Sequence, residues 1–230
     1  MNTSIKIISF SLWGTKQIYL TGAIRNAQMV KKFYPEFECW FYIHKDTVPE
    51  NIINELRKYD NVKIILKEGD LNSCKPRMWR FEAIDEPNVE VMLSRDTDTI
   101  ILLREKLAVD EWLNSDKIFH IMRDHPWHNF KIMAGMFGVK KSNITWKDKI
   151  DSFRQYDDYL YDQHFLQFII YPLYINSLMI HATFNKIEGD ICRDFPISLE
   201  DDDYRFVGEY VYEDESRNQQ NIIEIKRGYI

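Results

Sequence analysis

The sequence predicts a single α/β domain in which helices cover both faces of a mostly parallel sheet. Three apolar runs of strand length, at residues 5–11, 38–44 and 62–66, alternate with two segments of helical character. Strands that alternate with helices form βαβ units, and these units build parallel sheets. With 230 residues and 45% hydrophobic content, the chain is long enough for one sizeable core and short for two.

Local signals support each of the first five elements. The run at residues 5–11 is rich in isoleucine, and Gly14 allows a tight turn after it. Apolar residues recur at helical spacing over residues 16–33, and Pro35 closes that segment. Pro49 stands where a second helix would begin, because proline is favoured in a first helical turn.

The rest of the chain continues the pattern less regularly. A short helix is predicted from residue 77, and further helices at residues 104–114 and from residue 165 to Pro172. Strands are predicted at residues 89–94, 118–121 and 178–182. An apolar run with two glycines covers residues 132–139, and glycine inside such a run often marks the close approach of a ligand or of another backbone. From Leu199 the chain is acidic, which predicts a solvated, mobile segment, and residues 206–209 are expected to dock on the body.

Composition excludes several classes of protein. The formal charge of -6 argues against a nucleic-acid surface, which would present clustered positive charge. Three cysteines without C-x-x-C spacing indicate neither a disulfide framework nor a zinc site, so a reducing, cytoplasmic location is the simplest expectation. No stretch approaches the roughly 20 apolar residues of a transmembrane helix, and residues 1–12 lack the apolar core of a signal peptide.

The strongest functional signal is the pair of acids that follows the strand at residues 89–94. In open α/β sheets ligands bind at the carboxyl ends of the strands, so acids placed there face a crevice. If the backbone stays extended past Ser94, Asp96 and Asp98 point to the same side and can hold one cation. Paired carboxylates suit Mg²⁺ or Mn²⁺, which usually complete their coordination with substrate phosphates. Asp-x-Asp also arises by chance in a chain that is 29% charged.

Arg77 and Arg80 share a helix face just before this acidic strand. Planar guanidinium groups suit phosphate recognition, and the arginines lie close in sequence to the two acids. The alternative is that they form surface ion pairs with Glu82, Asp85 or Glu86.

Asp162 lies in or near the first turn of the helix that ends at Pro172. An acid there is stabilised by the helix dipole, and this would be a purely structural role. The functional interpretation is a carboxylate presented into the cleft.

Several short motifs occur in an order that makes a family resemblance specific, where a lone Asp-x-Asp would be weak. The chain resembles the small GT-A glycosyltransferases of large DNA viruses of algae and amoebae and of some bacteria, from its first strand almost to the C-terminus. The motifs are Ser94-Arg95-Asp96-Thr97-Asp98, Arg104-Glu105, Val109-Asp110-Glu111-Trp112, Met122-Arg123-Asp124-His125-Pro126, Ala134-Gly135-Met136-Phe137-Gly138, Asp162-Gln163 and Phe206-Val207-Gly208-Glu209.

The resemblance implies a Rossmann-like GT-A domain whose residues 1–98 bind the nucleotide and whose residues 99–230 bind the donor sugar and the acceptor. It implies a UDP-sugar as the favoured donor, a glycan or other hydroxyl acceptor, and Mn²⁺ or Mg²⁺ between the aspartates and the diphosphate. If the chain is viral, its location would be the host cytoplasm. By the same resemblance, Asp96, Asp98 and His181 are metal ligands, and the donor is held by Ser11, Leu12, Gly14, Arg77, Arg80, Arg95, Asp96, Asp124 and Gly135.

The chemistry predicted for such a site depends on charge. A divalent cation and arginines stabilise the leaving diphosphate. If the reaction inverts the anomeric centre, a carboxylate must take the acceptor proton, and Asp162 is the candidate. If it retains the configuration, Asp162 would bind sugar hydroxyls or support the reacting centre. Two other classes stay open, namely a metal-dependent phosphoesterase or nuclease and a sugar-binding module without catalysis.

Overall fold

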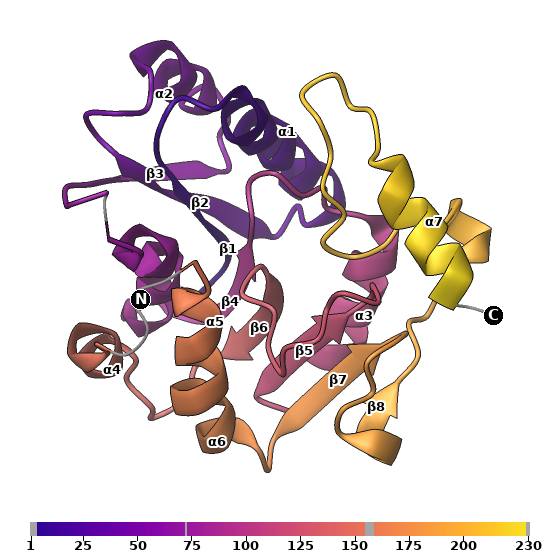
Figure 1. Ribbon diagram of the computed structural model, residues 1–230. Helices are drawn as coiled ribbons and strands as arrows, with labels where there is room; N and C mark the ends of the chain where they lie inside the picture. The colour runs from indigo at the N-terminus through magenta and orange to yellow at the C-terminus, as the bar shows by residue number, and fades with distance from the viewer. Residues whose placement is uncertain (1–3, 72, 155–158, 229–230) are drawn as a thin grey trace.

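An eight-stranded sheet runs through the computed structural model, which describes residues 4–71, 73–154 and 159–228. The strand order is β3-β2-β1-β4-β6-β5-β7-β8, as can be followed in Figure 1. Every neighbouring pair is parallel except the two that involve β6, which runs antiparallel to both β4 and β5. The predicted α/β class with a mostly parallel sheet is therefore confirmed.

The N-terminal part consists of alternating strands and helices. In chain order these are β1 (Ile5–Leu12), α1 (Gln17–Phe33), β2 (Phe37–His44), α2 (Glu50–Leu56) and β3 (Val62–Lys67). The bounds of the three strands and of α1, and the start of α2, match the sequence prediction within one or two residues. The reason is that each strand is a mainly apolar run and that glycine or proline marks where the helices begin or end.

The chain then returns to the centre of the sheet through η1 (Lys75–Asp85), a long 3-10 helix, and β4 (Val89–Arg95). Helix α3 (Leu103–Leu113) follows, and then β5 (Phe119–Arg123) and β6 (Met136–Lys140). Because β6 lies between β4 and β5 in the sheet, the loop that precedes it starts at the carboxyl end of β5 and ends beside that of β4.

The next segment carries α4 (Lys147–Ser152), α5 (Tyr161–Phe165), η2 (Leu166–Ile170), α6 (Tyr171–Tyr174) and β7 (Leu178–Ala182). The predicted helix before Pro172 is thus three consecutive helical pieces, of which η2 is a π-helical turn.

The C-terminal part contains η3 (Gly189–Ile191), β8 (Cys192–Arg193), η4 (Glu200–Asp202) and α7 (Gln219–Gly228), of which the sequence analysis predicted none. The acidic residues expected in a mobile tail form η4, and the predicted docking of residues 206–209 is confirmed because Phe206 and Val207 are buried.

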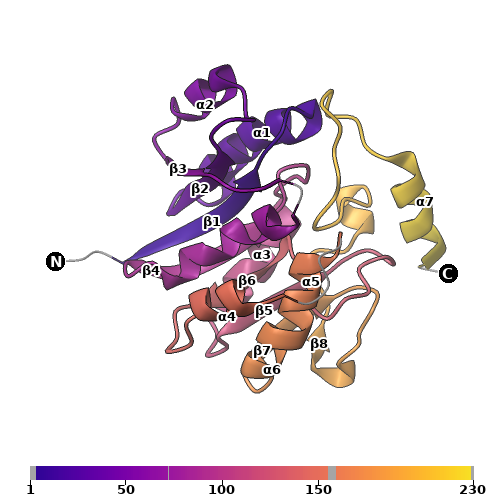
Figure 2. The same ribbon diagram turned by 60° about the vertical axis from the view of Figure 1, so that its left-hand side comes forward.

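Helices cover both faces of the sheet, as predicted. One apolar core contains residues of α1, α2 and α3, and the other contains residues of η1, α4, α5 and α6. Figure 2 shows α1 and α2 on one side of the strands and α4 and α6 on the other. Neighbouring positions of β1 face opposite cores, since Ile7 belongs to one and Ile8 to the other. This packing fixes the carboxyl ends of β1 and β4 next to each other.

Candidate functional site

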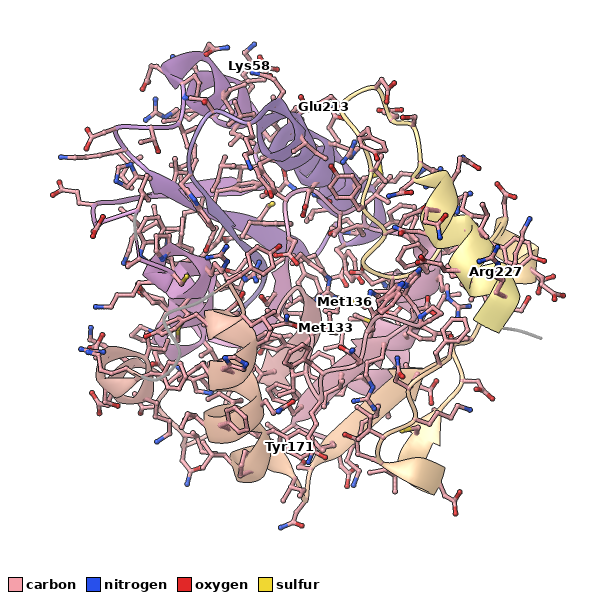
Figure 3. All side chains as sticks on the ribbon, viewed as in Figure 1. Lys58, Met133, Met136, Tyr171, Glu213 and Arg227 are labelled. Carbon is pink, nitrogen blue, oxygen red and sulfur yellow. The ribbon has the colours of Figure 1, made fainter. Side chains whose placement is uncertain are left out.

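A cavity of about 570 Å³ opens where β1 and β4 end. Ligands of open α/β sheets bind at this edge. Its walls come from the ends of β1 and β4, from α1, η1 and α5, from the loop before β6 and from the C-terminal segment. The lining residues are Ser11, Leu12, Trp13, Gly14, Lys16, Tyr19, Arg77, Arg80, Asp96, Thr97, Asp98, Thr99, His128, Met133, Ala134, Gly135, Met136, Tyr159, Asp162, Gln163 and Gly208. Figure 3 labels Met133 and Met136, which lie near the centre of the view.

Asp96 and Asp98 both line this cavity, although the backbone reason given from the sequence was wrong. After β4 the chain does not stay extended but turns at Thr97 and Asp98. The Thr99 hydroxyl closes the turn by donating to the Asp96 carbonyl at 2.9 Å. The turn thus places two carboxylates, separated by one residue, on the wall of a single cavity.

Two glycines allow the surrounding chain to approach this turn. A Cβ on Gly22 of α1 would lie 1.9 Å from the Thr97 carbonyl oxygen, and one on Gly135 would lie 2.0 Å from Asp96 Oδ2. The Gly22 contact is with backbone, so this position requires glycine. At Gly135 the nearest atom belongs to the half-exposed Asp96 side chain, so a Cβ there would require that side chain to move. The sequence interpretation of the glycines in residues 132–139 as a mark of close approach is confirmed at Gly135.

Arg80 connects the acids of the cavity. It is buried, and its guanidinium donates to Asp96 Oδ1, to Asp162 Oδ2 at 3.1 Å and to the Arg95 carbonyl at 3.1 Å. Its backbone N–H donates to Ser11 Oγ at 3.0 Å, which ties η1 to the end of β1. The alternative that Arg80 pairs with acids of its own helix is therefore wrong.

Asp98 is the least satisfied acid of the site. Its carboxylate has a hydrogen bond from the backbone N–H of Asp98 itself, and it has no hydrogen bond or ion pair with any other residue that the structure describes. Burial, and then the neighbouring charge of Asp96, raise the Asp98 pKa to about 7. Arg80 and Arg25 oppose this shift only in part. Two neighbouring carboxylates, one of them without an ion-pair partner, can act together as ligands of a hard divalent cation, which would balance their charge.

Asp162 lies in the first turn of α5, as predicted, and it lines the cavity. Its Oδ1 accepts from the Gln163 backbone N–H at 3.0 Å, and its Oδ2 accepts from Arg80. Burial raises the pKa of Asp162, while the charge of Arg80 lowers it.

Most of the residues that were predicted to bind the nucleotide-sugar donor lie around this cavity. Ser11, Leu12 and Gly14 at the end of β1, Arg77 and Arg80 of η1, and Gly135 all line the cavity with the three aspartates. Arg77 stacks on the ring of Tyr159, with 4.7 Å between the guanidinium carbon and the ring centroid.

Arg95 and Asp124 are the exceptions, since neither lines the cavity. Arg95 is buried on the opposite side of β4, where it pairs with Glu105 at 2.8 Å and donates to the Phe137 carbonyl at 2.9 Å. The carboxylate of Asp124 pairs with Arg104 at 2.7 Å and accepts from the Val207 backbone N–H at 2.9 Å. Both side chains therefore connect elements of the fold to each other, and we do not retain either as a residue that contacts the nucleotide-sugar donor directly.

His181 also lies away from the cavity, within β7. Its Nδ1 is 2.8 Å from His120 Nε2 and its Nε2 is 3.2 Å from Glu111 Oε2, so both ring nitrogens have protein partners. We therefore do not retain it as a ligand beside Asp98. The described residues hold no group of three or more His, Cys, Asp or Glu side chains arranged around a metal position.

Several lining residues were not among the site residues predicted from the sequence, such as Tyr19, His128, Gln163 and Gly208, although Gln163 and Gly208 belong to the motifs that carry the family resemblance. In the sequence, His125, Trp127 and His128 crowd around Pro126, which prevents regular strand pairing and so predicts a loop at a strand end that contacts a ligand. This pattern does not indicate which histidine faces the cavity. His128 is the one, and its Nδ1 accepts from the Asp124 backbone N–H at 3.0 Å. Burial lowers the pKa of His128 to about 3, so the ring is neutral.

We expect Asp98→Asn to stabilise the protein in the absence of divalent cations. An acid whose pKa is raised on folding opposes folding once it ionises, so the penalty is absent near pH 4 and complete above about pH 7. The variant should gain on the order of 1–3 kcal/mol of unfolding free energy near neutral pH, measured by urea denaturation in EDTA. Asp60→Asn, which removes an exposed acid paired with Lys31, should give no gain. A loss of stability in Asp98→Asn would contradict this description of Asp98.

The buried neutral His128 predicts acid sensitivity of the fold. Below about pH 6.5 the unfolded chain binds a proton at this residue and the folded chain does not, so stability falls as pH falls towards the folded pKa. Between about pH 7 and pH 5, wild type should lose about 2 kcal/mol more unfolding free energy than His128→Asn, whose amide oxygen can still accept from Asp124. Urea titrations at both pH values test this, and equal losses would show that His128 does not stay neutral on folding.

No helix in the part of the chain that the structure describes is both long and apolar enough to cross a membrane.

No family model and no curated protein matches the sequence. Solved structures do match, although at low sequence identity.

A galactosyltransferase, LgtC, in complex with donor and acceptor sugar analogues gives a TM-score of 0.50 at 12% identity, over 78% of this chain and 74% of that one. Residues 1–349 of S. aureus TarS give 0.50 at 14% identity, over 84% of this chain and 59% of theirs. A glycosyltransferase involved in glycosylation of the major capsid of PBCV-1 gives 0.49 at 16% identity, over 78% and 82%. Cytidylyltransferases also occur among the matches, with TM-scores of 0.46. The likeness concerns the fold alone, and it shows that this chain is a single α/β domain of the GT-A type found in nucleotide-sugar transferases.

Proposed function

We propose that this chain is a metal-dependent glycosyltransferase that moves a sugar from a nucleotide-diphosphate donor, preferably a UDP-sugar, to a hydroxyl of a glycan or another acceptor. The observation that carries the proposal is the composition of one cavity at the carboxyl edge of a GT-A sheet. Asp96, Asp98 and Asp162 line it together with Arg77 and Arg80, so side chains of the kinds that suit a cation, a phosphate and an acceptor proton line one cavity of about 570 Å³.

The residues at the end of β4 fit a divalent cation such as Mn²⁺ or Mg²⁺. The Asp98 carboxylate has no hydrogen bond or ion pair with another residue of the described chain, and Asp96 contributes a second, half-exposed carboxylate. Mg²⁺ in nucleotide sites is usually bound by one or two protein carboxylates together with phosphate oxygens of the substrate. When bound, the cation would neutralise the negative charge that develops on the leaving diphosphate.

The arginines of η1 supply further positive charge to the same place. Arg77 lines the cavity without an ion pair to any described residue, so its guanidinium can approach phosphate oxygens. Arg80 lines the cavity as well, and it adds positive charge there while it keeps Asp96 and Asp162 in position.

Asp162 is the candidate general base on the acceptor side. It is the acid of the lining that lies outside the Asp96 and Asp98 turn, and it comes from a different wall, α5. Burial raises its pKa towards the range in which a carboxylate accepts a proton efficiently, and the pair with Arg80 keeps it in place. In an inverting reaction Asp162 takes the proton of the attacking hydroxyl.

A two-metal phosphoesterase has less support from the same cavity. Such enzymes surround two ions with several carboxylate and histidine ligands, and the described residues offer no group of three or more. A sugar-binding module without catalysis would share the fold, and activity measurements distinguish it from an enzyme.

The test combines binding with turnover. Thermal unfolding should be measured with UDP-glucose, UDP-galactose and UDP-N-acetylglucosamine, each with Mn²⁺ and with EDTA, because a ligand of the native state raises the melting temperature. We expect at least one UDP-sugar to raise it only when Mn²⁺ is present, and to release UDP slowly by hydrolysis. In Asp98→Asn this release should fall by at least about 100-fold.

Asp60→Asn serves as the matched control, since it removes an acid far from the cavity in sequence and exposed to solvent. Equal thermal shifts in Mn²⁺ and EDTA would contradict the metal site. Rapid hydrolysis of p-nitrophenyl phosphate would favour the phosphoesterase, and Mn²⁺-dependent binding without any UDP release in the presence of acceptors would favour the binding module.

A further inference from the structure

Asn26 of α1 holds the backbone on both sides of Asp98. It is fully buried, and its amide nitrogen donates to the Thr97 carbonyl at 3.2 Å and to the Thr99 carbonyl at 2.8 Å. Both partners are acceptors, so the amide group must point its nitrogen at the turn, where both of its N–H bonds are used. One side chain therefore fixes the two carbonyl groups that flank Asp98 in the sequence.

The carbonyl of Asp98 itself is held by the C-terminal segment, because the Val211 backbone N–H donates to it at 3.0 Å. Arg25, the neighbour of Asn26 in α1, donates to the Val211 carbonyl at 3.3 Å and to the Tyr212 carbonyl at 3.1 Å. This segment passes beside the end of α1 in Figure 1. Two consecutive residues of α1 thus hold the Asp98 turn and the piece of chain that bonds to it.

Stability alone does not explain an asparagine at position 26. Its Oδ1 atom is buried and has no hydrogen bond with any described residue. A buried acceptor without a partner costs free energy, and asparagine is less favourable than leucine or alanine inside a helix. Ala23 and Val30, which share its face of α1, are buried and apolar. An apolar residue would be the simpler choice here, so the two hydrogen bonds to the turn indicate a requirement of the site.

Asn26 acts on the site without contact with a ligand. Asp96 and Asp98 line the cavity, whereas Asn26 does not. One helical turn earlier in α1, Gly22 lets the helix lie directly against the Thr97 carbonyl. Since the direction of a Cα–Cβ bond follows from the backbone on either side, a fixed turn also fixes where the side chain of Asp98 starts.

We propose that Asn26 is a positioning residue for the divalent cation, because it holds the turn so that Asp96 and Asp98 bind one ion in a defined geometry. This inference rests on the proposed function and adds the residue that sets the cation preference. Mg²⁺ demands nearly ideal octahedral coordination, whereas Ca²⁺ accepts flexible coordination. Release of the turn should therefore weaken the binding of Mg²⁺ more than that of Ca²⁺.

Three variants separate the hydrogen bonds from the fold. Asn26→Leu keeps the number and branching of the heavy atoms but cannot donate to the turn. Asn26→Ser is milder, since a hydroxyl donates one hydrogen bond. Asn61→Leu is the matched control: Asn61 donates to the Ala27 carbonyl of the same helix at 3.3 Å, and its Oδ1 is also buried without a described partner.

Mn²⁺ binding should be measured by electron paramagnetic resonance with excess UDP, against a sample of UDP alone. Competition with bound Mn²⁺ then gives the affinities for Mg²⁺ and Ca²⁺. We expect Asn26→Leu to weaken the binding of Mn²⁺ and Mg²⁺ by at least about 10-fold and that of Ca²⁺ by about 3-fold or less. Asn26→Ser should be intermediate and Asn61→Leu unchanged. Hydrogen exchange at the Val211 amide, measured without metal or nucleotide, should be faster in Asn26→Leu than in Asn61→Leu.

Urea denaturation checks that each variant folds, and Asn26→Ser carries the test should Asn26→Leu not fold. Unchanged Mn²⁺ affinity in a folded Asn26 variant would overturn the inference, and so would unchanged exchange at Val211. Equal losses for Mg²⁺ and Ca²⁺ would reduce Asn26 to a residue of the fold. Absence of Mn²⁺ binding in wild type would contradict the proposed function itself, whereas binding in wild type that the Asn26 variants retain in full contradicts this inference alone.

Discussion

The site depends on how negative charge is balanced where β4 ends. Three aspartates line one cavity, and a single buried guanidinium, that of Arg80, pairs with two of them. Asp98 has no such partner in the described chain, and burial, together with the neighbouring charge of Asp96, raises its pKa to about 7. Removal of a charged pair from water is expensive unless its geometry is good, so the arrangement persists only because the surrounding chain fixes it.

The surrounding chain does this by close approach and by buried ion pairs. Gly22 and Gly135 bring α1 and the loop before β6 against the Asp96 turn. Asp124, joined to Arg104, binds the backbone of Val207 and so holds the C-terminal segment over the same edge. Gly208 of this segment lines the cavity. The C-terminal part of the chain therefore completes a site whose charged groups come mainly from the N-terminal half.

Much of the fold could be predicted because its strands are nearly pure apolar runs that alternate with clear helical patterns. The position of the cavity at the carboxyl edge of the sheet could also be predicted, since acids that follow a central parallel strand face the crevice at that edge. What the sequence could not show was the antiparallel insertion of β6, because pairing direction depends on contacts far apart in the chain.

Most of the residues assigned by the family resemblance line the cavity, but Arg95, Asp124 and His181 do not, for a physical reason. A charged residue next to a strand end can face the cavity or pair inside the framework, and only packing decides. Side chains alternate along β4, so Arg95 faces away from Asp96 and meets Glu105 of α3. His181, within a strand buried on both faces, meets His120 instead of solvent. The orientation of the His128 ring depends on the backbone N–H of Asp124, whose direction no sequence pattern reveals.

The most direct test of the central claim is calorimetric titration of Mn²⁺ into the protein saturated with UDP. The balance of charge described here predicts one tightly bound Mn²⁺ per chain in wild type and weaker binding by at least about 10-fold in Asp98→Asn, with Asp60→Asn unchanged. Equal Mn²⁺ affinity in wild type and Asp98→Asn would show that the carboxylates at the end of β4 do not hold the cation.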